Sequence, residues 1–367
     1  MKIAHLTSVH VRTDTRIFYK ECSSLAKNGY QVSLIVADGK GDDLINDVTI
    51  YDVGRATNRF ARVVVVTERV FKKALELDCD VYHIHDPELI IVALSLKRKG
   101  KHVIFDIHEM THLQIMSKAW IPLPFRKIVS VLYSYFEKQA CKKFDFLITP
   151  QDQMTAYFSK FQKAITISNY PDHNFVYCKN KSSRFNIIYS GSISEARGLY
   201  NYIELIEKLV VLDSRYKLIL ACPLTSELHA RVNSSVAKKN IDLAGYVSFD
   251  RLLEYYACST FGLILFNNVG QYYMANALKL FEYMGSGLIV IMPDFGEWVD
   301  FNVANNAGFN VKTSSAEVIA NCINNISDDQ IEKIALHNHE IVLKRFAWAT
   351  EEVKLLNVYE EVVSYDV

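Results

Sequence analysis

The sequence predicts an α/β protein made of two doubly wound domains, each with a Rossmann-like parallel sheet. The chain has 367 residues and 50% of them are hydrophobic, which is enough for about two domains with substantial cores. Short runs rich in β-branched and aromatic residues alternate with helical patterns, as they do in βαβ units. This alternation stops once near the middle of the chain and then restarts, which indicates a second domain of the same kind.

The first domain is predicted to span residues 1–170. Helices are predicted at 16–27, closed by Asn28-Gly29, and at 88–99, closed by Gly100, because glycine commonly follows the last turn of a helix. The predicted strands are 2–7, 31–36, 48–53, 81–84, 102–107, 144–148 and 164–167.

Residues 171–184 contain Pro171 and a polar Lys-Asn-Lys-Ser-Ser run, and they are predicted to be an interdomain linker. The second domain is predicted at 185–348. Its strands are expected at 185–190, 217–221, 241–244, 261–266, 288–292 and 308–311. A final helix within 349–367 is expected to pack back on the first domain. Ligands of open parallel sheets bind at the carboxyl ends of the strands, so two such domains predict a cleft between facing ends.

Composition and charge argue against several function classes. Lys plus Arg and Asp plus Glu number 41 each, so no overall field attracts nucleic acid. The seven cysteines are scattered without a Cys-x-x-Cys pair, which fits a reducing compartment and predicts no metal site. The amino terminus lacks an apolar signal region, and no run approaches the ~18 apolar residues of a spanning helix. A cytoplasmic chain is expected.

The segment 276–291 is the most informative for function. At about 100° per residue, Asn276, Lys279 and Glu282 share one sector of a predicted helix that begins after a polar, glycine-containing loop. The amino end of this helix, with the amides around Ala277 and Leu278, would favour a phosphate, and Glu282 could accept hydrogen bonds from ribose hydroxyls. The alternative is that Lys279 and Glu282 form an ordinary surface pair.

A glycine loop at the end of the second domain's first strand is the other candidate phosphate site. Gly191 follows the strand and lets the backbone approach a ligand closely, and Arg197-Gly198 lies near the start of the next helix. The forked guanidinium of Arg197 suits diphosphate oxygens.

The order and spacing of several motifs resemble retaining glycosyltransferases of GT-B architecture, specifically the large family 4 and its bacterial surface-polysaccharide type. The resemblance covers nearly the whole chain. Its motifs are Asp14-Thr-Arg16-Ile-Phe, Tyr82-His-Ile-His85-Asp-Pro87-Glu, Phe105-Asp-Ile-His108-Glu, Tyr189-Ser-Gly191, Arg197-Gly198 and Lys279-Leu-Phe-Glu282-Tyr-Met-Gly-Ser-Gly.

The resemblance implies roles for individual residues. Glu282 matches the second glutamate of the family's Glu-x7-Glu motif, which binds the donor ribose, and His108 matches a histidine near the donor sugar. Arg197 stands where the family usually has a lysine that contacts the diphosphate. Met274 occupies the position of the first glutamate, so the sugar is left open.

The implied activity is hexosyl transfer from a nucleotide-diphosphate sugar, UDP- or GDP-linked, to a glycan or lipid-linked acceptor. The configuration would be retained, and no metal or other cofactor would be needed, because Arg197, Lys279 and the helix amino end would stabilise the leaving diphosphate. His108, Arg197 and Lys279 are the expected catalytic residues. The alternatives are a nucleotide-sugar epimerase or phosphorylase of the same architecture, and a non-catalytic nucleotide-sugar binding subunit motivated by Met274.

Three further features are ambiguous in the sequence. His83 and His85 alternate on one strand and would point the same way, which suits a metal but more often reflects structure. The loop 8–16 is charged and could contact an acceptor through His10, Arg12, Asp14 and Arg16, although Asp14 could equally be a helix N-cap. Residues 116–127 combine aromatics with cations, which suits a peripheral membrane contact, or a loop that buries Trp120 in the core.

Overall fold

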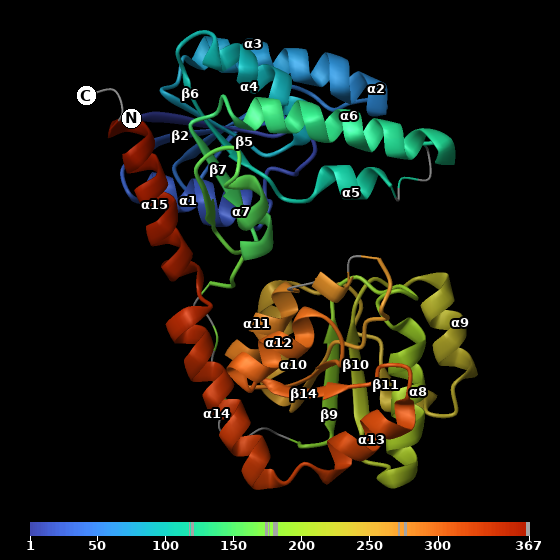
Figure 1. Ribbon diagram of the computed structural model, residues 1–367. Helices are drawn as coiled ribbons and strands as arrows, with labels where there is room; N and C mark the ends of the chain where they lie inside the picture. The colour runs from blue at the N-terminus through green and yellow to red at the C-terminus, as the bar shows by residue number, and fades with distance from the viewer. Residues whose placement is uncertain are drawn as a thin grey trace. The chain divides into compact units, whose positions relative to one another are not determined.

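The computed structural model describes residues 1–367 except 117, 119–120, 173–174, 176, 179–182, 271, 275–276 and 365–367. The chain divides into two compact units, residues 1–169 with 348–367, and residues 170–347 (Figure 1). Each has one parallel sheet with helices on both faces, so the predicted fold class of two doubly wound α/β domains is confirmed. Half of the predicted linker, 171–184, lies outside the described residues.

The sheet of the first unit has the order β3-β4-β2-β1-β5-β6-β7-β8, and the direction of winding reverses between β1 and β5. All described neighbours pair in parallel except β3 and β4. The strands are β1 (Lys2–Leu6), β2 (Gln31–Val36), β3 (Asp43–Ile45), β4 (Val48–Asp52), β5 (Val81–Ile84), β6 (His102–Asp106), β7 (Phe146–Thr149) and β8 (Ala164–Thr166).

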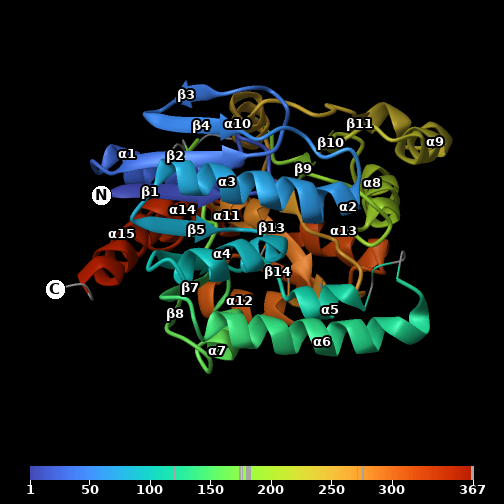
Figure 2. The same cartoon turned by 90° about the horizontal axis from the view of Figure 1, so that it is seen from above.

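Two hydrophobic layers enclose this sheet. One face is covered by helices α3 (Thr67–Leu77), α4 (Ile90–Lys97) and α6 (Leu123–Cys141), and the other by a π-helix η1 (Ile17–Cys22), α1 (Ser23–Lys27) and α15 (Trp348–Ser364). Figure 2 shows α3, α4 and α6 beside one another. The remaining elements are α2 (Arg59–Ala61), η2 (Arg62–Val66), η3 (Pro87–Leu89), α5 (Thr111–Ile115) and α7 (Asp152–Phe158).

Two local differences from the predicted elements have physical causes. β3 was not predicted: it pairs antiparallel with β4 through a tight turn at Asn46 and Asp47, both with positive φ, as in two-residue hairpins. The strand predicted at 144–148 begins at Phe146, because Phe144 closes the last turn after α6 by donating its N–H to the Cys141 carbonyl.

The second unit has the order β11-β10-β9-β12-β13-β14, entirely parallel among the described strands, and its winding reverses between β9 and β12. The strands are β9 (Asn186–Ser190), β10 (Lys217–Ala221), β11 (Ile241–Asp242), β12 (Phe261–Leu263), β13 (Ile289–Pro293) and β14 (Gly308–Val311). The helices are α8 (Leu199–Leu212), α9 (Ser226–Ser234), η4 (Lys238–Asn240), α10 (Phe249–Cys258), η5 (Tyr272–Met274), α11 (Leu278–Gly285), α12 (Glu297–Asn305), α13 (Ala316–Asn325) and α14 (Asp328–Arg345).

Glycines allow close packing at the reversal point of the second sheet. A Cβ at Gly262 of β12 would lie 2.4 Å from the Tyr283 ring of α11, and one at Gly198 would lie 2.1 Å from the Leu265 carbonyl oxygen. Helices α8 and α11 therefore approach the sheet beside the carboxyl ends of β9 and β12, where doubly wound sheets bind their ligands.

Candidate functional site

The glycine loop after β9 faces a lysine from α11. Gly191 has φ +98°, a conformation that glycine adopts without strain. A Cβ at this position would lie 3.2 Å from Nζ of Lys279 and 3.5 Å from its Cε. The lack of a side chain at Gly191 thus leaves the lysine next to open backbone.

The ammonium group of Lys279 is buried and unsatisfied. Among the described residues, its Nζ has no hydrogen-bond partner, and it lies 3.9 Å from the centroid of the Tyr189 ring and 5.4 Å from that of Phe266. Burial, and next the positive charge of Arg197, lower the pKa of Lys279 to about 7, although Glu282 opposes this shift. A cation held on an aromatic face without an anion is poised to accept one.

Arg197 lies at the end of the glycine loop, one residue before the N-cap of α8. Its Nε donates to the Tyr272 hydroxyl at 3.1 Å and one terminal nitrogen donates to the Ser192 carbonyl at 3.3 Å. The side chain is half-buried, so part of the guanidinium fork is accessible. Its charge adds to that of Lys279.

Glu282 is anchored by a chain of hydroxyl groups. Its Oε2 accepts a hydrogen bond from the Tyr256 hydroxyl at 3.0 Å, and this hydroxyl lies 2.8 Å from Oγ of Ser190. The backbone N–H of Ser190 donates to the Tyr283 hydroxyl at 2.9 Å. The end of β9 and helix α11 thereby hold the half-buried carboxylate one turn beyond Lys279.

Helix α11 begins at Leu278, and its first amides have no partner within the helix. Its N-cap, Ala277, provides no side-chain hydrogen bond. These amides add partial positive charge beside Lys279. Asn276, a predicted donor residue, lies outside the described residues.

The second unit thus brings together a glycine loop, two cationic side chains, a helix amino end and a carboxylate. Two positive charges and free amides can hold two phosphates, and a carboxylate can accept two hydroxyl groups. This is the arrangement that a nucleoside diphosphate requires.

Sequence reasoning missed the aromatic part of this site. The Tyr189 ring packs against the Lys279 ammonium, the Tyr256 hydroxyl donates a hydrogen bond to Glu282, and the Tyr272 hydroxyl accepts one from Arg197. The local sequence gives little signal for these roles, because tyrosines at strand ends and in helices are usually core residues.

In the first unit, His108 is coupled to a buried carboxylate. Its Nε2 lies 3.0 Å from Asp106 and 3.3 Å from Nδ1 of His85. Arg16 holds Asp106 through two hydrogen bonds of 2.8 and 2.9 Å. Burial alone would raise the pKa of Asp106, but Arg16 and His108 hold it well below its usual value. Asp106 is therefore an ionised group that orients His108.

The loop 8–16 contains both accessible and sequestered side chains. His10 lies between Asp14 at 3.1 Å and Asp86 at 3.5 Å, and its side chain is 27% exposed. Asp14 also accepts the backbone N–H groups of Arg16 and residue 17, as an N-cap does.

The two arginines of this loop are engaged within the domain. Arg12 forms a bidentate pair with Asp38 and is 5% exposed, and Arg16 is held by Asp106 and the Ile167 carbonyl. Their guanidinium groups stabilise the loop, which leaves His10 and Asp14 as its accessible acceptor-side candidates.

Comparison with known proteins agrees with the fold. Residues 15–169 match the family model Glycosyltransferase Family 4. The chain is similar to sucrose-phosphate synthase from Thermosynechococcus elongatus, with TM-score 0.78 and 14% identity over 100% of both chains. It is also similar to Anabaena HepE in complex with UDP-glucose, with TM-score 0.70 and 14% identity over 98% of this chain and 100% of that one. No curated protein sequence matches the chain.

The chain has the GT-B fold. A third structure, the UDP-forming α,α-trehalose-phosphate synthase from Burkholderia xenovorans, has TM-score 0.68 and 14% identity over 99% of both chains. The chain therefore has the predicted fold class over its full length.

Proposed function

We propose that this chain is a glycosyltransferase, which transfers a hexosyl group from a nucleotide-diphosphate sugar to a glycan or lipid-linked acceptor, with retention of configuration. The observation that carries the proposal is the buried, unpartnered Lys279 ammonium facing the Gly191 backbone. The similarity to HepE with bound UDP-glucose and to a UDP-forming synthase supports a UDP-sugar donor, and a GDP-sugar is the next candidate.

In the proposed reaction, the donor diphosphate binds between the Gly191 loop, Arg197, Lys279 and the amino end of α11. The ribose hydroxyls bind Glu282. As the bond to the sugar breaks, negative charge grows on the β-phosphate, and the two cations stabilise it without a divalent ion. The acceptor hydroxyl attacks from the face of the leaving group and passes its proton to the diphosphate.

Isothermal titration calorimetry against UDP, GDP, ADP and their sugars, with and without a chelator, tests the donor site. Selective binding that is insensitive to the chelator is expected. Glu282→Ala should weaken it, and Arg197→Ala should mainly lower turnover. The exposed pair Arg251 and Glu254 on α10 provides control substitutions, Arg251→Ala and Glu254→Ala. Unchanged binding and turnover in both site variants would refute the assignment.

Product analysis separates the rival functions. Transfer to an acceptor with retained configuration supports the proposal, and interconversion of nucleotide sugars without acceptor would indicate an epimerase. Donor binding without transfer or hydrolysis would indicate a binding subunit. Glu109, which is exposed beside His108, should tolerate Glu109→Gln, since no covalent sugar intermediate is proposed.

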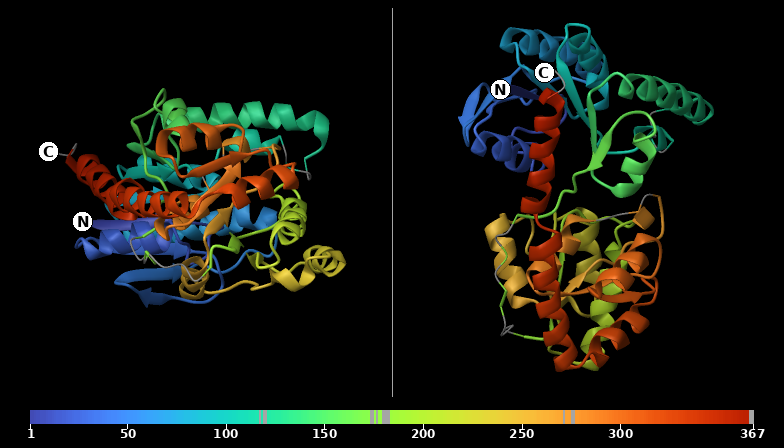
Figure 3. Two further views of the ribbon diagram at one scale, coloured as in Figure 1. Left: turned by 90° about the horizontal axis from the view of Figure 1, so that it is seen from below. Right: turned by 60° about the vertical axis from the view of Figure 1, so that its left-hand side comes forward.

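We also propose that the first domain binds anionic membranes through α6. This helix turns small and polar residues toward the domain, including Ser130, Ser134 and Glu137, and presents large apolar residues to solvent. The exposed apolar residues are Leu123, Phe125, Ile128, Val129, Val131, Leu132, Tyr135 and Phe136. Helix α6 lies at the edge of the domain in both panels of Figure 3.

Charge supports a lipid surface as the occupant of this face. Between residues 123 and 143 there are five cations and one carboxylate, Glu137, which is buried. An apolar face flanked by cations binds the interface of an anionic bilayer. Among the described residues, no helix is long and apolar enough to cross a membrane. The first part of the predicted contact, 116–127, includes residues outside those described.

Vesicle sedimentation tests the membrane proposal. Wild-type protein should bind phosphatidylglycerol vesicles more tightly than phosphatidylcholine vesicles, and salt should weaken the difference. Leu132→Asp should abolish sedimentation, whereas Val211→Asp, at an even more exposed apolar residue of α8, should not. Equal behaviour of the two variants would mean that α6 is not the contact.

A further inference from the structure

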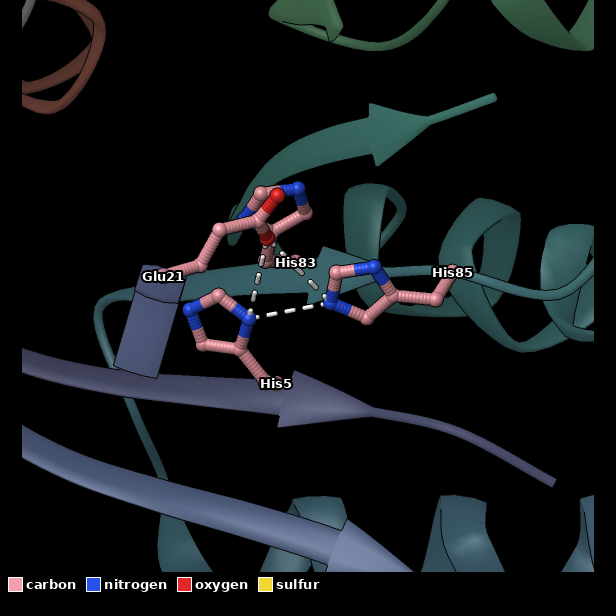
Figure 4. A group of neighbouring side chains, drawn as sticks. All are labelled: His5, Glu21, His83 and His85. Carbon is pink, nitrogen blue, oxygen red and sulfur yellow. Dashed lines mark hydrogen bonds and ion pairs between the residues drawn. The ribbon is translucent and has the colours of Figure 1, made fainter. Parts of the chain in front are cut away.

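A second group of polar side chains lies inside the first domain and is not used by the proposed transfer. His5 of β1, His83 and His85 at β5 and Glu21 of η1 are all at most 2% exposed (Figure 4). His5 and His83 are directly opposite in the parallel pairing of β1 and β5. We refer to these four residues as the histidine cluster.

The nitrogen and oxygen atoms at the centre of the cluster converge. One ligand atom from each residue lies within 4.8 Å of those of the other three. Nδ1 of His5 is 2.9 Å from Nε2 of His85, and a Glu21 carboxylate oxygen is 3.9 Å from each of these nitrogens. Tetrahedral zinc with bonds of about 2.0–2.1 Å places its ligand atoms roughly 3.3 Å apart. The observed separations lie on both sides of this value.

The outward-facing atoms of the cluster are each held by a neighbour. The Tyr359 hydroxyl of α15 lies 3.1 Å from Nε2 of His5 and 2.7 Å from Nδ1 of His83. Nδ1 of His85 is 3.4 Å from the Asp106 carboxylate, and the second Glu21 oxygen is 3.1 Å from Nε of Arg16. Metal-binding histidines usually have such outer partners, which fix the ring orientation.

The inward-facing atoms, in contrast, are poorly satisfied. Nε2 of His83 has no hydrogen-bond partner among the described residues, and the Glu21 oxygen that faces His5 and His85 lies 3.9 Å from both of their nitrogens. Two buried carboxyl groups, those of Glu21 and Asp106, share the one guanidinium of Arg16. A bound cation would supply a partner for Nε2 of His83 and for the inward oxygen of Glu21 at once.

The backbone that carries Glu21 also departs from the ordinary α-helical form. Residues Ile17–Cys22 form a π-helix, and Glu21 is its fifth residue. Such π-helical turns are rare and occur often at functional sites, because the extra residue turns a side chain to a new direction. Here that direction is toward His5 and His85.

We propose that His5, Glu21, His83 and His85 bind one Zn²⁺ ion in the interior of the first domain. Three imidazoles and one carboxylate are ligands that zinc accepts, and a closed shell of four protein ligands is typical of a structural site. The ion would tie β1, β5, η1 and, through Tyr359, α15 to one another. It is separate from the diphosphate site, so transfer itself still needs no metal.

The metal content of the intact protein tests this proposal directly. Because the site is closed, the protein is produced in medium supplemented with Zn²⁺ or Co²⁺, and metal is measured by mass spectrometry after exhaustive dialysis. One equivalent per chain is expected, and the Co²⁺ form should show the visible absorption of a four-coordinate site. His83→Gln should lower the metal content at least tenfold. His229→Gln, at an exposed histidine of α9, should leave it unchanged.

A second measurement covers the case in which His83→Gln does not fold. Wild-type protein is unfolded with a chelator and refolded with or without Zn²⁺, and Tyr359→Phe should weaken uptake by about 10- to 100-fold. Nucleotide binding by the second domain is followed in parallel as an independent readout. Folded wild-type protein with less than about a tenth of an equivalent after both loading routes would overturn the proposal. The cluster would then be a metal-free hydrogen-bonded network built on the His5–His85 contact.

Discussion

The charge state of Lys279 should control donor affinity. Its pKa is lowered to about 7 by burial and by Arg197, and a diphosphate beside it requires the ammonium form. Donor binding must therefore be coupled to the uptake of a proton when the pH is above 7. The perturbation is a change of pH, with Lys279→Arg and Lys279→Met as the matched variants.

The size of the effect follows from the fraction of Lys279 that is charged. This fraction is about one half at pH 7 and about 3% at pH 8.5, and the cost per pH unit approaches about 1.4 kcal/mol only well above the pKa. The dissociation constant for UDP-glucose should thus rise about 15-fold from pH 7 to 8.5. In Lys279→Arg the charge persists at all these pH values, so the slope should vanish. Lys279→Met should bind weakly at every pH.

Stability should change in the opposite sense. Because the pKa of Lys279 is lower in the folded protein than its ordinary value of 10.5, the unfolded chain binds more protons between pH 7 and 10.5. The free energy of unfolding should rise with pH across this window. Below the window, the destabilisation caused by the lowered pKa of Lys279 is present in full. Lys279→Met removes the penalty and should raise the unfolding free energy at pH 7 by up to about 4 kcal/mol.

Calorimetry of UDP-glucose binding in buffers of different ionisation enthalpy measures the proton uptake, and urea unfolding from pH 6 to 9 measures the stability slope. Uptake close to half a proton is expected at pH 7.0 and close to one proton at pH 8.5. Affinity that does not vary with pH in the wild type, or an unchanged slope in Lys279→Arg, would refute the assignment of the charged ammonium to the diphosphate.

Three further predictions concern stability, and each uses chemical unfolding as its assay. Gly198→Ala should lower the free energy of unfolding by more than about 2 kcal/mol, because its Cβ would collide with the Leu265 carbonyl and its φ is +82°. The control Gly29→Ala has a similar φ but open space around the Cβ, so it should lower the free energy of unfolding by about 1 kcal/mol. Equal losses in the two variants would exclude the collision. Asn338→Leu should lower the free energy of unfolding by about 2–4 kcal/mol, because the buried Asn338 amide donates two 2.8 Å hydrogen bonds to carbonyl groups that would lose their partner. A loss below about 1 kcal/mol would contradict this. Burial raises the pKa of Glu137 to about 7, so wild-type stability should fall as pH rises from about 4.5 to 7, and Glu137→Gln should abolish that slope.

Most of the fold was predictable because it is encoded in local patterns. The alternation of apolar strands with capped helices fixes the order of elements, and the strands at 31–36, 81–84, 217–221 and 308–311 have their predicted bounds. β3 was missed because three exposed or half-exposed residues beside a tight turn have little hydrophobic periodicity. The π-helical form of residues 17–22 could not be predicted either, since it depends on what packs around Glu21.

The candidate diphosphate site was partly predictable, because its residues are grouped in two short segments. Gly191 and Arg197 belong to one loop, Lys279 and Glu282 to one helix, and the parallel topology brings these segments together. Their tyrosine partners were not predictable from local sequence. Tyr256 lies 26 residues before Glu282, and its contact exists only once β9, α10 and α11 have packed.

The distinction between paired and unpaired buried charge was beyond the sequence, and it is the distinction that best separates structure from function here. Arg16 looked like an acceptor-side residue, yet each edge of its guanidinium has a carboxylate or carbonyl partner, so its charge is already used. Lys279 was predicted to contact phosphate, with a surface pair as the alternative, and its ammonium has no acceptor within the described residues. A buried polar group without a partner destabilises the folded protein, so its presence suggests that a ligand supplies the partner. By this criterion Nε2 of His83, which has no hydrogen-bond partner within the described residues, belongs with Lys279 and not with Arg16, and the physical reasoning that assigns an anion to Lys279 assigns a cation to the histidine cluster.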